Sequence, residues 1–498
     1  MIQAWRQRKE IESDALDYIA EKSESGEDPY LMSWAPGDLR NPHNWPLYRK
    51  WLVTIQVALI AFIVGMAGSI NSAADVYAAE KFGVSLEVIS LQTGLFLVGF
   101  GLSSPIMGPL SELSGRLPTY EFPLLIFSAF CLGSGFAPNI QTRVILRFFA
   151  GIFGAAPLSN AGGSVADMCG PLERTYLFPL FSCIGFLGVP LGPILGGWIG
   201  EKSNQEWCDF VTAIVGLAIA VGCFFFMPET QSAELLKGRS RALRKHTGDN
   251  RYRTAMEVML EERNESFFMV ICKSMAQCVM FLFTEPITLC FALYLTIVYI
   301  VMFGDLESYP IIFAIYDWDS GKTGSVFAAM FVGMVFTGCL TPIVYKFYLR
   351  AQKKADITGE PVHPEHRLLL AMFGTWCMPV SLFWGAWTAY KSVSPWSLIV
   401  GQFVFGIGAL CCFNSSYMYV IDVYTVNAAS PLAALVFLRY IVAGAGSVMF
   451  TRPMFDGMGI HWAMSFLGFI AIAVSLVPIV FYIFGPQLRA RSKYAMSQ

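Results

Sequence analysis

The sequence predicts an all-α integral membrane protein whose twelve transmembrane helices form two six-helix bundles. Hydrophobic residues make up 55% of the 498 residues, and charged residues only 14%. The apolar residues gather in twelve runs of about 18–27 residues, each long enough for a helix to cross about 30 Å of hydrocarbon. One polar, basic stretch divides the runs six and six, which indicates two matched halves.

The twelve runs cover most of the chain. They are residues 51–71, 87–107, 121–138, 144–166, 175–199, 209–227, 278–303, 323–346, 367–389, 397–420, 429–450 and 461–485. We therefore predict an N-terminal tail, a six-helix bundle, a central loop, a second six-helix bundle and a C-terminal tail, with boundaries at 1–50, 51–227, 228–275, 276–485 and 486–498.

The distribution of positive charge predicts the orientation in the membrane. The net charge of −2 shows no basic excess for binding nucleic acid, and 26 of the 34 lysines and arginines fall in the two tails, the central loop and the loops on the same side. The loops of the other side hold Lys81, Arg143, Lys202, Lys322, Lys391 and Arg452. The positive-inside rule then places both termini in the cytoplasm. We expect a monomer in the plasma membrane, with a vacuolar or other internal membrane as the alternative.

A short polar segment joins the second and third runs. The segment Gly108–Arg116 contains two glycines and a proline, as expected of a tight turn between helices. Glu112, Gly115 and Arg116 lie here, and Asp167 follows the fourth run at the same membrane depth. The three charged residues are candidates for a latch whose ion pairs hold one conformation and release in another. The alternative is a solvated loop.

Two arginines lie inside predicted spans. A charged residue there costs roughly 2.5–3.5 kcal/mol, so we expect Arg147 and Arg439 to face a cavity or a partner. They are candidates for the proton-coupling or translocation path. For Arg147, near the start of its span, the alternative is a side chain that extends to the outer headgroups.

The fifth run combines glycine with proline. Gly188, Gly192 and Gly196 recur every four residues and form one smooth helix face, which lets a neighbouring backbone approach closely. Gly197 lies next to this face. Pro190 and Pro193 each remove a backbone donor and bend the helix, which suits a moving interface.

These motifs together resemble the major facilitator superfamily, specifically its fungal 12-span drug:proton antiporters. The resemblance covers nearly the whole chain. It rests on Asn41–Pro46 with Lys50-Trp51, Gly108–Arg116, Arg147–Gly151, Gly188–Gly197, Pro228–Thr230 and Phe283–Pro286. The Gly188–Gly197 segment is similar to the antiporter motif. The Gly108–Arg116 loop departs from the family pattern, since Glu112 stands where the family usually has aspartate and Leu117-Pro118 follow where it usually has further basic residues.

The resemblance implies the major facilitator fold and alternating access by a rocking motion of the two halves. It also implies export driven by inward proton flow, with no cofactor or metal. Acids near the middle of spans are scarce, so our hypothesis is that Glu307 or Asp167, assisted by Arg147, carries the proton. Glu285 and Arg439 complete the predicted coupling path.

Polar and aromatic side chains within the spans predict a substrate cavity. The candidates are Asn71, Gln92, Asn160, Tyr294, Tyr299, Trp384, Asn414 and Tyr417. Aromatic stripes in membrane helices are more often packing or interface belts. A pocket of aromatic rings and amides with few acids suits neutral or weakly acidic amphipathic molecules better than polyamines.

We therefore predict an exporter of small amphipathic organic compounds, either drug-like toxins or secondary metabolites. The first alternative is a proton-coupled importer or facilitator of a small organic solute, such as a nutrient or a polyamine. An enzyme would need His, Asp or Cys clustered at one depth, and the spans offer no such set. The two-half layout argues against a channel or receptor.

Overall fold

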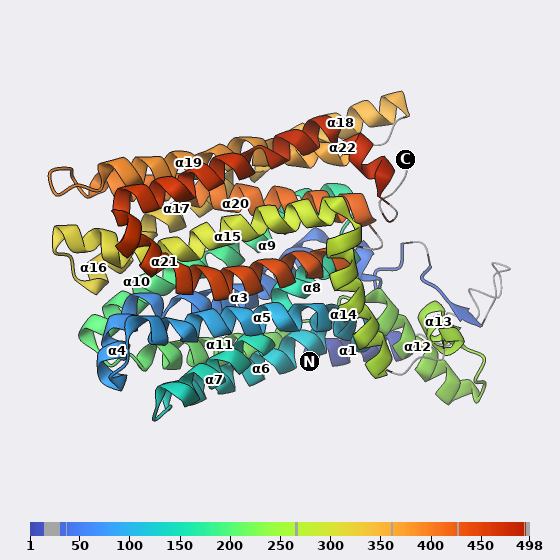
Figure 1. Ribbon diagram of the computed structural model, residues 1–498. Coiled ribbons are helices and arrows are strands. Elements are labelled where there is room, and N and C mark those ends of the chain that lie inside the picture. The colour runs from blue at the N-terminus through green and yellow to red at the C-terminus, as the bar shows by residue number, and fades with distance from the viewer. Residues whose placement is uncertain are drawn as a thin grey trace.

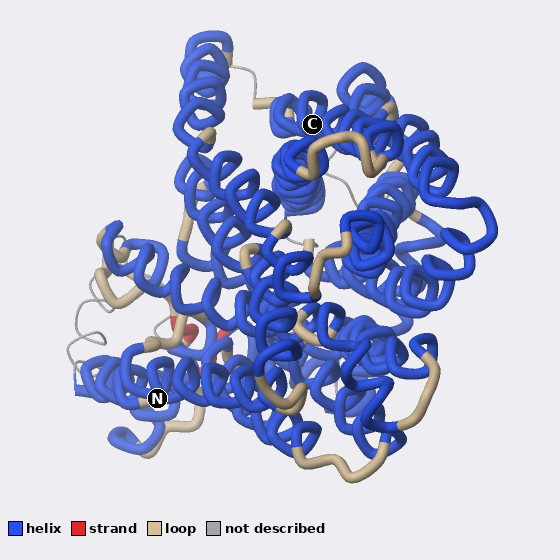
Figure 2. The backbone as a smooth tube through the Cα atoms, turned by 90° about the vertical axis from the view of Figure 1, so that its left-hand side faces the viewer, coloured by secondary structure: helices blue, strands red, loops and turns tan. Residues whose placement is uncertain are grey.

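Two groups of helices run roughly parallel and lie side by side in the computed structural model (Figure 1). The structure describes residues 1–13, 30–35, 37–263, 267–359, 362–425, 428–492 and 494. The N-terminal group, blue to green, fills the lower part of Figure 1, and the C-terminal group, yellow to red, fills the upper part. Figure 2 looks along the helices and shows a fold that is helical almost throughout.

The N-terminal group extends from α3 to α11. Its elements are α3 (Leu47–Ser69), η2 (Ser72–Ala74), α4 (Asp75–Phe82), α5 (Leu86–Ser114), α6 (Arg116–Gly135), α7 (Ile140–Gly154), α8 (Ala156–Met168), α9 (Pro171–Phe186), α10 (Gly188–Lys202) and α11 (Trp207–Phe226).

The C-terminal group extends from α14 to α22. Its elements are α14 (Phe267–Thr284), α15 (Pro286–Phe313), η3 (Ala314–Tyr316), α16 (Ser320–Ser325), α17 (Phe327–Cys339), α18 (Thr341–Thr358), η4 (Pro364–Leu368), α19 (Leu369–Thr388), α20 (Trp396–Tyr424), α21 (Ala429–Ser475) and α22 (Val477–Arg491).

Both termini lie at one end of the molecule, on the right in Figure 1, which we call the terminal end. Here the N-terminal segment packs on the central segment. The elements are α1 (Ile2–Ser13), β1 (Leu31–Met32), η1 (Pro42–Asn44), α12 (Ser232–Thr247), β2 (Arg253–Thr254) and α13 (Ala255–Arg263). The two short strands pair in parallel, and α1 contacts α11 and α12. The opposite end, which carries α4 and α16, is called the far end.

The described residues contain eleven helical segments long and apolar enough to cross a membrane. Two shorter apolar helices accompany them, Met269–Thr284 and Ala429–Gly444, and the predicted span 429–450 begins with the second. Gly459, with φ of +73°, separates the last two predicted spans within α21, and the second of them continues into α22. The prediction of an all-α membrane fold is confirmed.

Proline explains where several spans differ from straight helices. The predicted span 278–303 is interrupted at Glu285, because Pro286 begins α15 at a position where its missing N–H is tolerated. The helix α15 then continues to Phe313. Pro157 and Pro342 likewise stand in the first turns of α8 and α18, so the fourth and eighth spans each consist of two joined helices.

The predicted turn over Gly108–Arg116 is wrong in its extent. The helix α5 continues through Pro105 and Pro109 to Ser114, and the chain turns at the single residue Gly115. Its φ of +95° is strained for any residue with a side chain, so glycine is required there.

The two groups meet along two seams. At the first seam α5 packs on α21, where a Cβ on Gly444 would come within 2.6 Å of the Leu97 side chain. At the second seam α10 packs on α16 and α17. The cavity and the small central space described below lie between the two groups.

Candidate functional site: charged ends and an aromatic centre

The latch residues lie at the terminal end, where α5 turns into α6. Arg116 Nε donates to Asp167 Oδ2 at 2.9 Å, and its Nη1 donates to Ser111 Oγ at 2.9 Å. The structure therefore brings Arg116 and Asp167 together. The Glu112 side chain is exposed, and only its backbone carbonyl is bound, by Gln231 Nε2 at 2.9 Å. Glu112 forms no ion pair in the described part of the chain.

Glu229 binds the start of α6, the helix that carries the latch residue Arg116. The sequence analysis did not assign this role to it. Its carboxylate accepts the backbone N–H groups of Arg116 at 2.9 Å and Leu117 at 3.1 Å, which are the first two of α6. A carboxylate at a helix N-terminus satisfies free donors and complements the helix dipole. Burial nevertheless raises the pKa of Glu229. The sequence could have identified Glu229 as a candidate, because this residue belongs to the Pro228–Thr230 motif.

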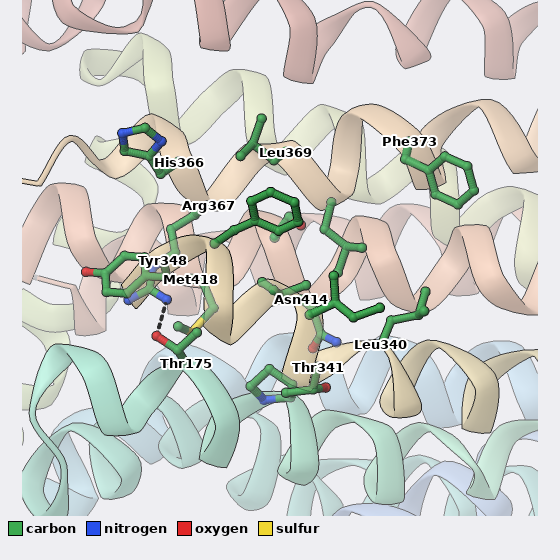
Figure 3. A pocket seen from close by; sticks show the side chains of 16 residues that line it. Thr175, Leu340, Thr341, Tyr348, His366, Arg367, Leu369, Phe373, Asn414 and Met418 are labelled. Atoms are coloured by element: carbon green, nitrogen blue, oxygen red, sulfur yellow. Dashed lines mark hydrogen bonds between the residues drawn. The ribbon is translucent and has the colours of Figure 1, made fainter. Parts of the chain in front are cut away.

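A second ion-pair cluster joins the two groups at the same end. Asp422 of α20 accepts Arg367 Nε at 2.6 Å and lies 3.4 Å from Arg174 Nη1 of α9. Arg367 also donates to Thr175 at 2.6 Å and to the Pro171 carbonyl at 3.1 Å, so it bridges η4 to α9. Figure 3 shows the bond from Arg367 to Thr175.

A cavity of about 500 Å³ lies between the groups at the terminal end. Its lining includes residues of both clusters, namely Gly108, Glu112, Arg116, Asn160, Asp167, Arg174 and Asp422. Asn160 is buried, and neither of its side-chain polar atoms has a hydrogen-bond partner in the described part of the chain. A polar cavity with an unsatisfied amide is suited to admit a small solute.

A second, mostly apolar pocket of about 210 Å³ lies between α9, α18, α19 and α20 (Figure 3). Asn414 lines it and also contacts Ser182 of α9 through a hydrogen bond. At the centre of the molecule the space between the groups shrinks to about 30 Å³, lined by rings that include Phe186, Tyr299 and Tyr440.

The helix α10 packs on α3 of its own group and on α16 of the C-terminal group. A Cβ at Gly188, Gly192 or Gly196 would collide with α3 or the residue after it, at the Phe62 carbonyl, Ser69 and the Ile70 carbonyl. On another face, a Cβ at Gly197 would collide with the Ser320 carbonyl of α16. Pro190 and Pro193 are buried in this helix, and the Pro193 carbonyl faces Gly324 of α16.

A charge network closes the far end of the N-terminal group. Arg147 pairs with Asp209 and donates to the Ala67 carbonyl at 2.8 Å. Arg143 lies 3.0 Å from the other oxygen of Asp209, and Gln92 accepts Arg143 Nε at 2.8 Å. Arg143 was predicted in an outer loop, which is wrong, because it lies in the first turn of α7 and is buried with its acid partner.

Asp209 was missed by the sequence analysis. It stands alone at the start of the sixth apolar run, and the cost argument used for Arg147 would have identified it. Gln92, predicted in the cavity, instead links Arg143 to Asp75, to which it donates at 2.7 Å.

Two further acids lie near the far end of α15. Glu307 lies 3.6 Å from Arg452 of α21, so Arg452 is a partner within a helix and not a loop residue. Asp305 accepts a hydrogen bond from Gln402. Glu307 is also close enough to Asp75 of α4 for their charges to interact. Both carboxyl groups are buried, and they belong to opposite halves of the molecule.

Arg439 lies in the part of α21 that precedes Gly459, and it is fully buried. Its guanidinium lies 4.5 Å from the ring centre of Tyr299 and 5.2 Å from that of Tyr417. No carboxylate of the described residues pairs with it, and its nitrogens have no hydrogen-bond partner there.

The remaining candidates lie away from this centre. Tyr294 donates to Thr375 at 3.3 Å within the C-terminal group, and Asn71 is buried beyond the end of α3. Trp384 is 40% exposed and donates to Ser397, so it lies on the bundle surface rather than in a cavity. Glu285 lies at the terminal end, where it accepts the Tyr424 hydroxyl at 3.0 Å.

Comparisons with known proteins agree with this architecture. The model of the Major Facilitator Superfamily matches residues 57–448. An uncharacterized transporter of Schizosaccharomyces pombe is 41% identical over 95% of this chain and 87% of its own length. An MFS-type efflux pump of Trichophyton rubrum is 34% identical over 99% of this chain and 82% of its own length.

Among solved structures, the proton:xylose symporter XylE has a similar fold, with a TM-score of 0.61 at 13% identity over 88% of this chain and 96% of that one. The chain belongs to the major facilitator superfamily and is a transporter, not an enzyme.

Proposed function

We propose that this member of the major facilitator superfamily exports small amphipathic organic compounds in exchange for protons. The similarity to a named efflux pump supports the direction of transport. The polar cavity and the aromatic centre between the groups support an amphipathic solute.

In this proposal the terminal end faces the cytosol of a cell whose plasma membrane holds the protein. The excess of lysine and arginine in the terminal-end segments supports this orientation. The 500 Å³ cavity then opens toward the cytosol, where a substrate for export would enter. The close packing of α10 on α16 blocks the exterior in this state.

The buried carboxyl pair Asp75 and Glu307 is the observation that carries the proton coupling. The two belong to opposite halves and their charges interact, and Arg452 lies 3.6 Å from Glu307. In this proposal one member of the pair holds a proton while the halves are closed at the far end. When the far end opens, water reaches the pair from the exterior and the protonation state can change.

The driving force is sufficient for useful export. One charge that crosses a potential of 100 mV supplies about 2.3 kcal/mol. Each unit of pH difference adds about 1.4 kcal/mol.

Ion pairs at the terminal end provide the conformational switch. Arg116–Asp167 lies within the N-terminal group beside the cavity, and Arg367 with Asp422 connects α9 to the C-terminal group. Opening of the far end requires the terminal end to close, and both clusters lie where the groups approach one another.

Reconstituted vesicles with an imposed proton gradient test the proposal. Wild type is expected to move a labelled aromatic amphiphile against its gradient, and a protonophore to abolish this. Asp75→Asn and Glu307→Gln are expected to retain downhill exchange of the substrate but to lose proton-driven accumulation. Glu87→Gln, an exposed acid at the start of α5, is the matched control.

Full proton-driven accumulation by both carboxyl variants would refute the assignment of the pair. Movement of substrate in the same direction as protons would instead identify an importer. Downhill movement alone would identify a facilitator.

A further inference from the structure

Arg439 is a buried cation that no carboxylate of the described residues neutralises. Its exposed fraction is 0%, and Nε, Nη1 and Nη2 all lack a hydrogen-bond partner in the part of the chain that the structure describes. Every other fully buried arginine named above has a carboxylate beside it. A guanidinium has five N–H donors, and leaving them unmet in a low-dielectric interior is unfavourable.

Aromatic rings surround the guanidinium in place of an acid. Besides Tyr299 and Tyr417, the ring centres of Tyr440 and Phe413 lie 5.1 Å and 5.3 Å away. Cation–π attraction stabilises the charge without using its N–H donors. The cage therefore stabilises the charge of Arg439 with no carboxylate beside it in the described part of the chain.

The wall of this cage is shared between the two halves. The Phe186 ring packs at a tilt on Phe413 with ring centres 4.3 Å apart, and Phe100 stacks on Tyr440 at 4.2 Å, so rings of the N-terminal group cover the cage of the C-terminal group. Tyr299 and Tyr440 also line the small central space between the groups. A rocking motion that separates the halves would remove the covering rings and expose the guanidinium.

The lining of the terminal-end cavity and the cage share two helices, α20 and α21. Ile421 and Leu432 line the cavity. Tyr417 is one helical turn from Ile421, or about 6 Å, and Arg439 is two turns from Leu432, or about 10 Å. The Tyr417 hydroxyl also lacks a hydrogen-bond partner among the described residues. Both side chains therefore lie within one or two helical turns of residues that line the cavity, and separation of the halves would connect them to it.

We propose that Arg439 and Tyr417 form a binding site for the anionic group of the substrate, so that the transported compound is an amphipathic organic anion with an aromatic or apolar body. This inference rests on the proposed transport function and narrows its substrate class. The guanidinium and the hydroxyl bind a carboxylate or a comparable oxyanion, and the rings of the cage stack on the body. Cationic compounds are excluded, because Arg439 repels them.

A matched pair of probes tests the charge requirement directly. Radiolabelled 2-naphthoate is ionised at neutral pH, and 2-naphthamide has the same ring system without the charge. Binding to purified protein in nanodiscs, without any gradient, is expected to favour naphthoate by about tenfold or more, the factor expected from one charge-assisted interaction. Equal binding of the two probes, or failure to bind naphthoate, would overturn the inference.

Variants then assign the preference to Arg439. Arg439→Gln is expected to abolish the preference for naphthoate, and Arg439→Lys to restore part of it. Arg350→Gln, at an exposed arginine of α18, should leave the preference unchanged. A preserved preference in Arg439→Gln would contradict the assignment. Tyr417→Phe, which removes one donor and keeps the ring, provides a second test and should reduce the preference without loss of fold.

This experiment is separable from the test of proton-driven export. Proton-driven transport of the amide without any anion preference would refute the anion site and leave the export proposal intact. A clear anion preference without proton-driven transport would support the anion site and refute the export proposal.

Discussion

Arg147 and Arg439 are equivalent by sequence and opposite in the structure. Each is a lone arginine in an apolar run, and each is buried. Arg147 shares Asp209 with Arg143 at the far end of the N-terminal group, whereas Arg439 faces four aromatic rings at the centre. One buried cation thus belongs to a network with a carboxylate, and the other has only aromatic rings around it among the described residues.

The energetic consequences differ accordingly. Removal of one partner from a buried ion pair costs about 3–5 kcal/mol, because it leaves an uncompensated charge. Removal of a charge that has no partner loses only its cation–π contacts, of about 0.5–2 kcal/mol, and relieves a desolvation penalty. The predictions below test this contrast.

The largest effect is expected for Asp209→Asn. This change leaves Arg143 and Arg147 buried without a carboxylate, and we expect a loss of about 3–5 kcal/mol in stability. Thermal unfolding of the purified protein in detergent measures it, with Glu87→Gln as the control. An unchanged midpoint would mean that the two arginines are already stabilised by Gln92, Gln205 and the Ala67 carbonyl.

A smaller effect is expected for Asp167→Asn. Its pair with Arg116 is partly exposed, so solvent screens it, and we expect a loss of about 1–2 kcal/mol. The stronger consequence should be slower transport, because the latch no longer holds the cavity-open state. Single and double substitutions of Arg116 and Asp167 together measure the coupling energy between the two side chains. A coupling energy near zero would show that the pair is not a latch.

Arg439→Met is expected to change stability by no more than about 1 kcal/mol in either direction, because the lost cation–π contacts and the removed desolvation penalty oppose one another. The same thermal unfolding assay applies. A loss as large as that of Asp209→Asn would erase the contrast and indicate that Arg439 is a structural residue.

Glu229 extends the comparison to a buried anion and gives the smallest effect. Its partners are backbone N–H groups, and burial raises its pKa above the ordinary glutamate value. The folded state therefore holds the proton more tightly than the unfolded state. The stability from this group is present below the ordinary pKa and declines as pH rises through the raised pKa.

We expect the unfolding midpoint of wild type to fall relative to Glu229→Gln as pH is raised from about 4 to about 7. Parallel curves for the two proteins would show that the backbone donors offset the cost of burial completely.

The spans were predictable because their signal is local. An apolar run of sufficient length forms a helix wherever it meets lipid, and proline marks where the helices break. The glycines of α10 were likewise readable as a face for close packing. The extent of the Gly108–Arg116 turn was not, because Pro105 and Pro109 are accommodated inside α5 and only Gly115 turns the chain.

Partners between distant segments were not predictable. Nothing local connects Arg143 and Arg147 with Asp209, Glu307 with Arg452, or Arg367 with Asp422, since each pair depends on how helices far apart in the chain are packed. Trp384 illustrates the same limit, because its ring suits a pocket or a surface equally and only packing placed it outside.

The amino-acid sequence by itself determined that the chain crosses the membrane repeatedly in two matched halves, because hydrophobic length and charge distribution act residue by residue along the chain. The tertiary structure alone decided which buried charges are neutralised and which remain available, because electrostatic compensation depends on distances of a few ångströms between helices. Arg439 is charged in any fold of this sequence. The packing of this fold places aromatic rings, and no carboxylate of the described residues, beside it.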